Sequence, residues 1–559
     1  MEQEKLFPEM KDEGVNELDR TKDVNCVRKV TFKEYQVNKV FLFPPSSDDY
    51  IPGNHIARLL DYIVEKMDIS EIEKTYKGGG SSAYHPRMLL KVWLLGFIYK
   101  IYTSRKLAQA IKENIAFIWI SGGDSPDFRT LNNFRLRLKE DIKKIFKEIV
   151  IYGMGLGVIK GGDIFIDHTK MEVCANGNKM VWKKQVEKEL EKIDRELDTL
   201  FKYIDELNIE EDKRYGGRGI EGEVELDSEK LDKMVESINE KMRNKEIEKG
   251  EGKEEKKKLK RAKELIERKE IYEEKEGLLG GRNSYSKTDH DATAMRQKEG
   301  ITTKPSYNEG IAVENGFVLN YEIGQNGADN VNFKEIVDGV TENLGKPPEN
   351  IHTDGAYGNE ENMAYLKEKK IGNYLKYNSY NNEKKGKRDR GKVRKEGFKY
   401  DSERDCYICV EGKELKLKIE KENILPSGYR QRMKEYQASE EDCKGCPLKS
   451  YCTRGKARTI TVLPTYEELK KEAKANLDSE KGKELRRQRG YQVESLFGER
   501  KMNGKYRRYF LRGLKKVYIE TGLYYMSVNI KKIYSYLMGL FSISSFKGGG
   551  EVFIPLGIK

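Results

Sequence analysis

The sequence predicts a multidomain α/β protein with an all-α N-terminal domain. Three observations lead to this fold class. The chain has 559 residues, which is too long for a single hydrophobic core. Helical periodicity fills residues 50–155, whereas short β-rich stretches fill residues 156–184 and 281–378. Between these two stretches, residues 185–280 predict charged helices, so the α/β sheet is expected to be interrupted by a helical arm.

The composition excludes several classes of protein. Charged residues make up 36% of the chain and the formal net charge is +12, which is mildly basic and argues only weakly for a polyanionic partner. The N-terminus lacks the apolar stretch of a secretory signal, and no apolar stretch is long enough to span a bilayer. Seven cysteines are too few for a disulfide framework. We therefore expect a cytoplasmic protein with no membrane contact.

The N-terminal part divides into a polar leader, residues 1–49, and a helical domain, residues 50–155. Its last segment, "SPDFRTLNNFRLRLKEDIKKIFKEIV", has Asp127 or Thr130 as the helix cap. Two successive helices, the second with arginines near its start, are typical of a helix-turn-helix-like DNA reader. The DNA-contacting side chains would be Arg129, Arg135 and Arg137. The alternative is a plain helical bundle whose arginines are solvated.

The remaining chain alternates between strands, helices and insertions. Residues 185–280 carry interspersed charges of both signs and predict an antiparallel helical arm without catalytic residues. Strands return at 281–325, and "VNFKEIVDGVTENLG" predicts a helix that ends at Gly345. Residues 381–479 are basic and contain five cysteines, and residues 480–545 are helical and basic.

Three acidic residues are candidates for a metal-dependent site. In "GGDIFIDHTK", Asp167 follows three apolar residues, and we expect it at the end of a buried strand. Asp354 lies in "NIHTDGAYGN", and Glu494 lies in "RGYQVESLFGERK". Carboxylates that lie together repel one another unless cations neutralise them, and oxygen ligands suit Mg²⁺ or Mn²⁺. Two such ions activate a water or hydroxyl and stabilise the leaving oxygen in phosphodiester cleavage.

The Glu494 segment has a basic character that suits a phosphate backbone. Arg487, Glu494 and Lys501 recur every seven residues, with Tyr491 three before Glu494, so a helix would place all four on one face. The expected DNA contacts in the C-terminal region are Arg487, Arg489, Lys501, Arg507, Arg508 and Arg512.

These motifs together resemble the DDE transposases of bacterial insertion sequences. "HPRMLLKVWLLGFIYKIYTSRKLAQAIKENIAFIWISGGDSPDFRTLNNFR" resembles the helical N-terminal domain of one branch of that group. "DIFIDHTKMEV", "HTDGAYGNEEN" and "RGYQVESLFGERKMNGKYRRYFLRGLKKVYIETGLYYMSVNIKK" resemble its two Asp motifs and its Glu block. Some relatives have Tyr, Arg, Glu and Lys spaced as Y-x2-R-x3-E-x6-K. Glu494 and Lys501 fit the last part, but Arg487 and Gly490 stand at the Tyr and Arg positions, and Arg487 or Arg489 is a candidate substitute.

The resemblance implies a ribonuclease-H-like mixed-sheet core, formed by residues 156–184, 281–380 and 480–545 and split by insertions. It implies catalytic roles for Asp167, Asp354, Glu494 and Lys501, with the three acids holding two Mg²⁺ or Mn²⁺ ions. Asp163 lies in the same strand as Asp167, and alternation alone does not exclude it, but the motif favours Asp167. His168 and His352 are expected to line the site rather than to bind metal.

The resemblance also bears on the cysteines. Cys443, Cys446 and Cys452 are close in sequence, and Cys406 and Cys409 lie upstream, so five thiols offer four places around a structural Zn²⁺. Relatives of this type often have one upstream cysteine and three downstream ones. The expected ligands are therefore Cys409, Cys443, Cys446 and Cys452. The alternative is a small subdomain with unmetallated thiols.

The implied activity is cleavage of insertion-sequence ends and their joining to target DNA. The expected partner is double-stranded DNA, bound by a homodimer, and no small-molecule substrate is expected. Two alternatives remain: a metal-dependent nuclease that cuts without joining, and an inactive DNA-binding protein derived from a transposase. The protein is expected to be bacterial and to associate with the nucleoid in the cytoplasm.

Overall fold

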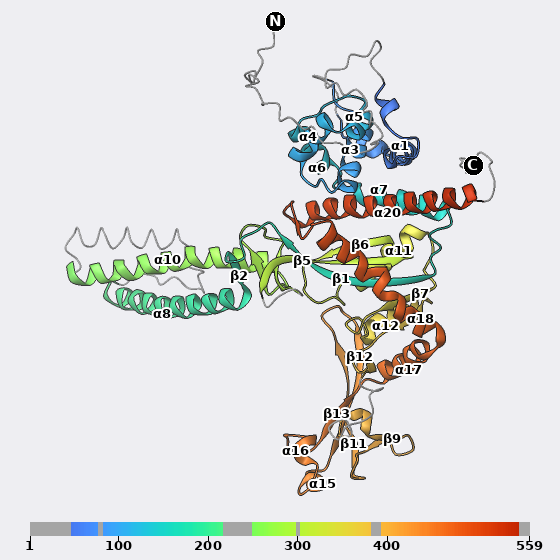
Figure 1. Cartoon of the computed structure of the whole chain (residues 1–559). Helices are drawn as coiled ribbons and strands as arrows, with labels where there is room; N and C mark the ends of the chain where they lie inside the picture. Colours follow the sequence, from blue (N-terminus) through green and yellow to red (C-terminus); the bar gives the residue numbers. More distant parts are fainter. Residues whose placement is uncertain (1–45, 77–81, 216–248, 298–301, 382–392, 547–559) are drawn as a thin grey trace, which may run out of the picture. The chain divides into compact units, whose positions relative to one another are not determined.

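The computed structural model describes residues 46–76, 82–215, 249–297, 302–381 and 393–546. The chain forms two compact units, residues 1–50 and residues 51–559. In the first unit only the turn η1 (Ser47–Tyr50) is described, so most of the expected polar leader lies outside the described residues. The second unit is a mixed α/β structure with a helical N-terminal region and a mixed sheet, as the sequence predicts (Figure 1).

In the described residues from 51 to 155, the N-terminal part of this second unit is helical. Of the two predicted caps, Asp127 is the one that caps α6, where it accepts a 2.7 Å hydrogen bond from the Thr130 N–H; Pro86 is the first residue of α3. Trp93 is fully buried and donates its indole N–H to the Leu131 carbonyl, which joins α3 to α6. The helices are α1 (Ile56–Lys66), α2 (Ser70–Lys74), α3 (Pro86–Ile98), α4 (Ser104–Glu113), α5 (Ile115–Ile120), α6 (Phe128–Arg137) and α7 (Ile142–Gly155).

The central sheet is mixed. Strand β1 (Asp163–Val173) pairs antiparallel with β5 (Thr303–Glu314) on one side and parallel with β7 (Asn350–Thr353) on the other. The next strands outward are β6 (Phe317–Gly324), which is antiparallel to β5, and β8 (Gly372–Leu375), which is parallel to β7. Two short strands extend the sheet, β4 (Thr293–Arg296) beside β5 and β14 (Arg508–Tyr509) beside the end of β1.

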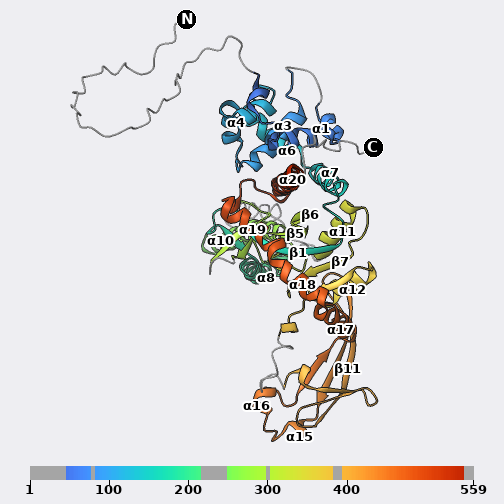
Figure 2. The same ribbon diagram turned by 45° about the vertical axis from the view of Figure 1, so that its right-hand side comes forward.

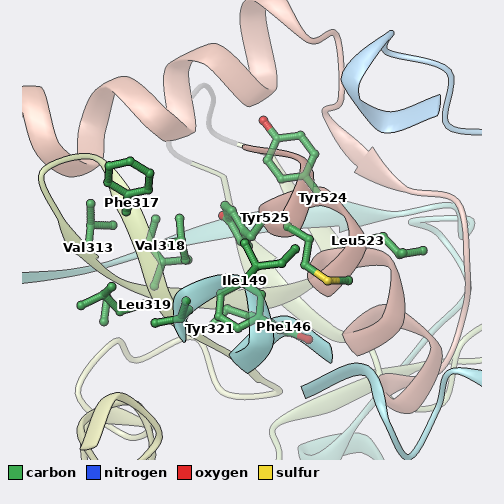
Figure 3. Close-up of a cluster of buried hydrophobic side chains, with 14 of the residues drawn as sticks. Phe146, Ile149, Val313, Phe317, Val318, Leu319, Tyr321, Leu523, Tyr524 and Tyr525 are labelled. Carbon is green, nitrogen blue, oxygen red and sulfur yellow. The ribbon is translucent and has the colours of Figure 1, made fainter. Parts of the chain in front are cut away.

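Apolar side chains bury this sheet against helices. Figure 3 shows residues of β5, β6, α7 and the C-terminal helix α20 (Leu514–Phe546) packed together, among them Phe146, Val318, Tyr321 and Leu523. Helix α11 (Phe333–Leu344) packs on β5 and β6 and ends at Gly345, as predicted, where φ is +70°. Helix α12 (Glu360–Glu368) lies between β7 and β8 in the chain. Burial on both faces explains why Ile164, Phe165 and Ile166 form a continuous apolar run.

The arm consists of two long helices that lie side by side, α8 (Lys183–Tyr215) and α10 (Lys249–Leu279) (Figure 1). They run in opposite directions, because α8 follows β2 (Met180–Trp182), α10 precedes β3 (Ser284–Ser286), and these two strands pair antiparallel. Ion pairs such as Arg268–Glu189 at 2.6 Å link the helices over a small core of Ile193, Leu197 and Leu265. Residues 216–248, between these two helices in the chain, lie outside the described residues.

The cysteine-bearing region forms a second sheet of five strands in the order β13-β12-β11-β10-β9. Residues 382–392, the centre of the predicted basic loop, lie outside the described residues. Helices α17 (Pro464–Asp478) and α18 (Glu480–Arg489) then lead back past β8 and β7 toward β1 (Figure 2). The other elements of this region are η2 (Lys395–Gly397), β9 (Lys399–Asp401), β10 (Cys406–Ile408), β11 (Glu414–Ile424), β12 (Arg430–Ala438), α15 (Glu440–Cys443), α16 (Lys449–Cys452) and β13 (Thr459–Val462).

Within the ranges that the structure describes, no helix is both long enough and apolar enough to cross a membrane.

Candidate active site

Asp167 lies in the middle of a strand and not at its tip. Strand β1 continues to Val173, so the expectation that the strand ends on this carboxylate is wrong. The strand continues because β5 pairs with it from Phe165 to Glu172, which satisfies the backbone groups on that side. On the other side, β7 pairs only with residues 163–165. Asp167 therefore lies beside the end of β7, with 3% of its surface exposed.

The register of the two parallel strands brings Asp354 next to Asp167. Phe165 of β1 is paired with His352 of β7. Asp167 comes two residues after Phe165, and Asp354 comes two residues after His352. Neighbouring strands lie ~4.8 Å apart, so side chains at matching positions are neighbours. Asp354 is the first residue after β7 and its carboxylate accepts a 2.9 Å hydrogen bond from the Ala356 N–H, which shapes the turn. Two acids 187 residues apart in sequence thus meet through strand pairing.

Glu494 reaches the same place from a π-helical turn. After α18, the chain forms the π-helical turn η3 (Gly490–Glu494), the helix α19 (Ser495–Gly498) and the π-helical turn η4 (Glu499–Asn503). The turn η3 packs against β1 and β5. Its Gln492 side chain accepts a 2.6 Å hydrogen bond from the Gly316 N–H in the β5–β6 turn. Such π-turns are rare and are frequent at functional sites.

The predicted common face of Arg487, Tyr491, Glu494 and Lys501 does not form. Two π-turns interrupt the α-helix, so positions seven apart no longer align. Arg487 pairs with Glu484 on the surface, and Tyr491 is 81% exposed. The Lys501 ammonium bonds instead to Thr169 Oγ1 at 2.7 Å and to the Lys170 carbonyl at 3.1 Å. Lys501 therefore holds its turn against the strand that bears Asp167.

The three acids surround one guanidinium, that of Arg489. Its Nη2 lies 3.0 Å from Asp167 and 3.7 Å from Asp354, and its Nη1 lies 3.1 Å from Glu494. The exposure of the carboxylates increases outward, from 4% for the Asp167 side chain to 37% for Asp354 and 61% for Glu494. The site is therefore an acidic edge with a buried inner end, an open outer end and a cation at its centre.

The residues present fit a divalent metal in kind but not in their present arrangement. Three carboxylates are the oxygen donors that Mg²⁺ and Mn²⁺ prefer. In the part of the chain that the structure describes, no group of three or more His, Cys, Asp or Glu side chains stands in metal-holding geometry. The Arg489 guanidinium contacts all three carboxylates, so a positive charge already stands among these oxygen donors.

Asp163, the other acid of this strand, lies away from the cluster. Its carboxylate accepts a 2.8 Å hydrogen bond from Asn350 and pairs with Lys481 at 2.9 Å. It thus fixes the beginning of β1 to β7 and to α18. This position makes Asp163 a suitable control for any experiment on Asp167.

Two buried histidines lie beneath the acids. The His168 Nδ1 is hydrogen-bonded to the Tyr357 hydroxyl, which links β1 to the loop after Asp354. Both ring nitrogens of His352 are buried without a hydrogen-bond partner. Burial, with the positive charges of Arg489 and Arg486, lowers the pKa of His352 to about 3, so this ring is neutral.

A fully buried ion pair fixes the end of the Glu494 segment. Arg500 pairs with Glu309 of β5, and neither side chain is exposed. The hydroxyls of Tyr509 and Tyr525 also donate to the Glu309 carboxylate. Because Arg500 precedes Lys501, this network holds the turn η4 to the sheet beside Asp167. Sequence reasoning did not identify it.

The predicted DNA contacts of α6 differ in their exposure. Arg129 is exposed, whereas Arg137 is exposed but donates a 3.0 Å hydrogen bond to the Thr75 carbonyl. Arg135 is only 4% exposed, and its guanidinium lies 4.4 Å over the Trp93 ring. The prediction that Arg135 contacts DNA does not fit this burial. Helical spacing turns this residue inward, toward the same side as Leu131 and Phe134.

The predicted basic residues after Lys501 follow strand β1. Arg508 in β14 lies opposite Glu172 in the parallel backbone pairing of β14 with β1. The Arg512 Nε donates a 2.8 Å hydrogen bond to the Cys174 carbonyl. Arg507 and Arg508 are exposed. These cations therefore line the continuation of the strand that carries Asp167.

Three of the clustered cysteines, Cys409, Cys443 and Cys446, lie near Cys452. Burial raises the pKa of the Cys452 thiol, and the charges of Cys443, Cys409 and Cys446 add to this effect. Backbone N–H groups donate to two of these sulfurs, Lys413 to Cys409 at 3.3 Å and Arg458 to Cys443 at 3.4 Å. Cys406 is buried in β10 instead. As they stand, these thiols do not form a metal-holding group.

Two segments of the chain match known sequence families. Residues 45–137 match the family described as "Transposase domain (DUF772)", and residues 408–534 match the family described as "Transposase DDE domain". The second match contains Glu494 and Lys501, whereas Asp167 and Asp354 lie outside both matched segments. No curated protein and no solved structure matches the chain. The two family matches, which together cover less than half of the chain, confirm the resemblance to DDE transposases that the motifs predict.

Proposed function

We propose that this protein cleaves the DNA ends of an insertion sequence and joins them to a target by metal-dependent phosphodiester transfer. One observation carries the proposal. Asp167, Asp354 and Glu494 come from three separate segments of the chain, and all three contact the same guanidinium. Acids far apart in sequence meet at one cation where a site is built to hold positive charge.

The strand order supports a ribonuclease-H-like core. From β6 through β5, β1 and β7 to β8, the first two pairings are antiparallel and the last two are parallel. In this reading, residues 156–184, 281–380 and 480–545 form the catalytic core, residues 50–155 the DNA-binding domain, residues 185–280 an arm, and residues 381–479 a cysteine-rich insertion. Asp167 stands on β1 and Asp354 directly follows β7, and these two strands are a parallel pair.

Asp167, Asp354 and Glu494 are the residues that would hold two Mg²⁺ or Mn²⁺ ions. Ions at such a site activate an attacking water or hydroxyl and stabilise the leaving oxygen. Asp167 is held by a strand that is paired on one side along its length, so its carboxylate is fixed before substrate arrives. Glu494 is the most exposed of the three, and it stands at the side from which DNA would enter.

The basic residues beside the acids suit the backbone of double-stranded DNA. Arg507 and Arg508 are exposed, and Arg508 lies beside the end of β1. Lys501 bonds to Thr169, two residues after Asp167 on the same strand. Cations at such positions neutralise phosphates and set the register of the duplex. Arg129 on α6 would supply a second contact. A homodimer on DNA is part of the proposal, since two element ends have to be brought together.

The cysteine cluster supports a structural zinc site as a further part of the proposal. The proximity of Cys409, Cys443 and Cys446 to Cys452 and the N–H bonds to two sulfurs suit a closed tetrahedral site. Such a site would fix the five-stranded sheet, whose own core is small.

The experiment uses a supercoiled plasmid that carries the gene with its flanking DNA, incubated with purified protein and Mg²⁺. We expect Asp167→Asn, Asp354→Asn and Glu494→Gln each to abolish cleavage while binding of the same DNA is retained, because binding rests on cations. The double variant Asp354→Asn/Glu494→Gln should be as inactive as either single variant. Asp163→Asn is the matched control and should retain activity. Full cleavage by Glu494→Gln would contradict the assignment.

The products of the same reaction separate the alternatives. Joined target DNA supports the transposase, cut ends without joining indicate a nuclease, and binding without cutting indicates an inactive relative. Sequencing of the flanking DNA adds an independent test, because matched inverted repeats would identify the substrate.

A further inference from the structure

Arg489 is the basic residue at the centre of the three carboxylates. Its guanidinium contacts Asp167, Asp354 and Glu494 with two nitrogens, at distances between 3.0 and 3.7 Å. The sequence pattern had suggested a DNA contact for this side chain. Since 18% of it is exposed and its charge faces three carboxylates, it is not available to a phosphate in this arrangement.

The local backbone explains why Arg489 and Glu494 meet. They are five residues apart, a spacing that does not align side chains in an α-helix. The turn η3 between them is π-helical, and in a π-helix the hydrogen bonds join residues five apart. The π-turn thus places the Glu494 carboxylate over the preceding arginine.

Three carboxylates at one place need a positive charge. The Asp167 side chain is only 4% exposed, and a buried ionised carboxylate is costly unless a cation pairs with it. Arg489 supplies that cation. It is not fully bound, however, because its Nε is buried without a hydrogen-bond partner. A guanidinium with one unsatisfied nitrogen is held by the acids more than by the surrounding protein.

We infer that Arg489 is a positioning residue that holds the three carboxylates together in the metal-free protein and competes with divalent ions for them. The inference rests on the proposed function, since it needs the acids to be the metal ligands. The oxygens that contact the guanidinium are the ones that a divalent ion would bind, so the arginine has to withdraw when the ions enter.

Arg487 provides a matched control on the same helix. It is two residues away, its side chain is 76% exposed, and it forms an ion pair with Glu484, outside the acid cluster. Replacing it removes an equal charge from α18 but no contact with the three acids.

The test measures Mn²⁺ binding to the full-length protein in the absence of DNA, by calorimetry. We expect Arg489→Ala to bind Mn²⁺ at least about tenfold more tightly than the wild type, which corresponds to ~1.4 kcal/mol. The melting temperature of the metal-free variant should fall, because the carboxylates then repel one another, and Mn²⁺ should raise it more than in the wild type. Arg487→Ala should leave both quantities unchanged.

Two further variants make the outcome unambiguous. Arg489→Lys keeps the charge without the two-nitrogen contact and should bind Mn²⁺ with intermediate affinity. This variant allows the Mn²⁺ affinity to be compared even if the alanine variant does not fold. Equal Mn²⁺ affinity of the wild type and both Arg489 variants overturns the role of Arg489. The Asp167→Asn variant distinguishes a failure of the role of Arg489 from a failure of the proposed function. If it loses Mn²⁺ binding, the metal site stands whatever Arg489 does, and if it binds Mn²⁺ as the wild type does, the metal site and the inference both fail.

Discussion

The buried pair of Arg500 and Glu309 makes a strong prediction about stability. Both side chains have no exposed surface, so removing one charge leaves the other in an environment without water. Breaking a buried ion pair by removing one partner costs about 3–5 kcal/mol. Glu309→Gln is the perturbation, because it keeps the shape and removes the charge. The hydroxyls of Tyr509 and Tyr525 would also lose a charged acceptor.

The aromatic rings around Arg500 offset part of this cost. Its guanidinium lies 4.5 Å from the ring centre of Tyr524 and 4.6 Å from that of Tyr506. Each cation–π contact contributes about 0.5–2 kcal/mol and persists in Glu309→Gln. We therefore expect a loss of ~3 kcal/mol in the free energy of unfolding, at the lower end of that range.

Urea denaturation followed by circular dichroism measures the effect, and Glu499→Gln is the control. Glu499 is the neighbour of Arg500 and pairs with Lys531 at 3.2 Å, but both of these side chains are about half exposed. Such a surface pair contributes at most ~1 kcal/mol. The double variant Glu309→Gln/Arg500→Met should lose less than the sum of the single variants. Equal losses in Glu309→Gln and Glu499→Gln would refute the reasoning.

Three other predictions concern the zinc site, the arm and the DNA-binding helix. Metal analysis of the purified protein should find about one zinc per chain. The Cys452→Ser variant should lose this zinc, and the Cys406→Ser variant should keep it. A wild-type protein that contains no zinc after purification without chelator would contradict the site. Replacing residues 187–276 by a short Gly/Ser linker should leave a folded protein, because loop closure costs little free energy and the arm has its own small cores; loss of cooperative unfolding would count against it. Arg129→Ala should reduce the salt dependence of DNA binding by about one unit of slope, whereas Arg135→Ala should lower the melting temperature and leave that slope unchanged. The opposite pattern in a salt titration would show that the buried arginine reaches DNA.

Much of the fold was predictable because its signals are local. The cap of α6 and the end of α11 at Gly345 follow from residue types at helix ends. The alternation of charges predicted the two helices of the arm. Asp167 could be chosen because it follows three apolar residues typical of a buried strand, and Asp354 because its surrounding sequence resembles the second Asp motif of the transposases.

The details that failed depend on pairing and on helix type, which no local pattern encodes. The end of β1 is set by β5, whose residues come 130 or more positions later. The π-turns around Glu494 shift the helix faces, so the seven-residue spacing of Arg487 and Lys501 was misleading. Arg489 was counted as a DNA contact, although its five-residue distance to Glu494 becomes informative once a π-turn is known. Arg135 was misjudged because charge suggests exposure, whereas Trp93 offers it an aromatic face.

The position of β1 at the centre of the sheet has a consequence for synthesis on the ribosome. Its antiparallel neighbour β5 begins at Thr303, so residues 174–302 have to be translated before β1 finds that partner. At ordinary elongation rates this takes on the order of ten seconds. During that time the nascent strand has unpaired edges, and Asp167 lacks Arg489, which is made far later. The acid cluster therefore assembles only after Glu494 has been made, and a chain terminated between Asp354 and Arg489 would contain both Asp residues without the arginine and the glutamate that complete the cluster.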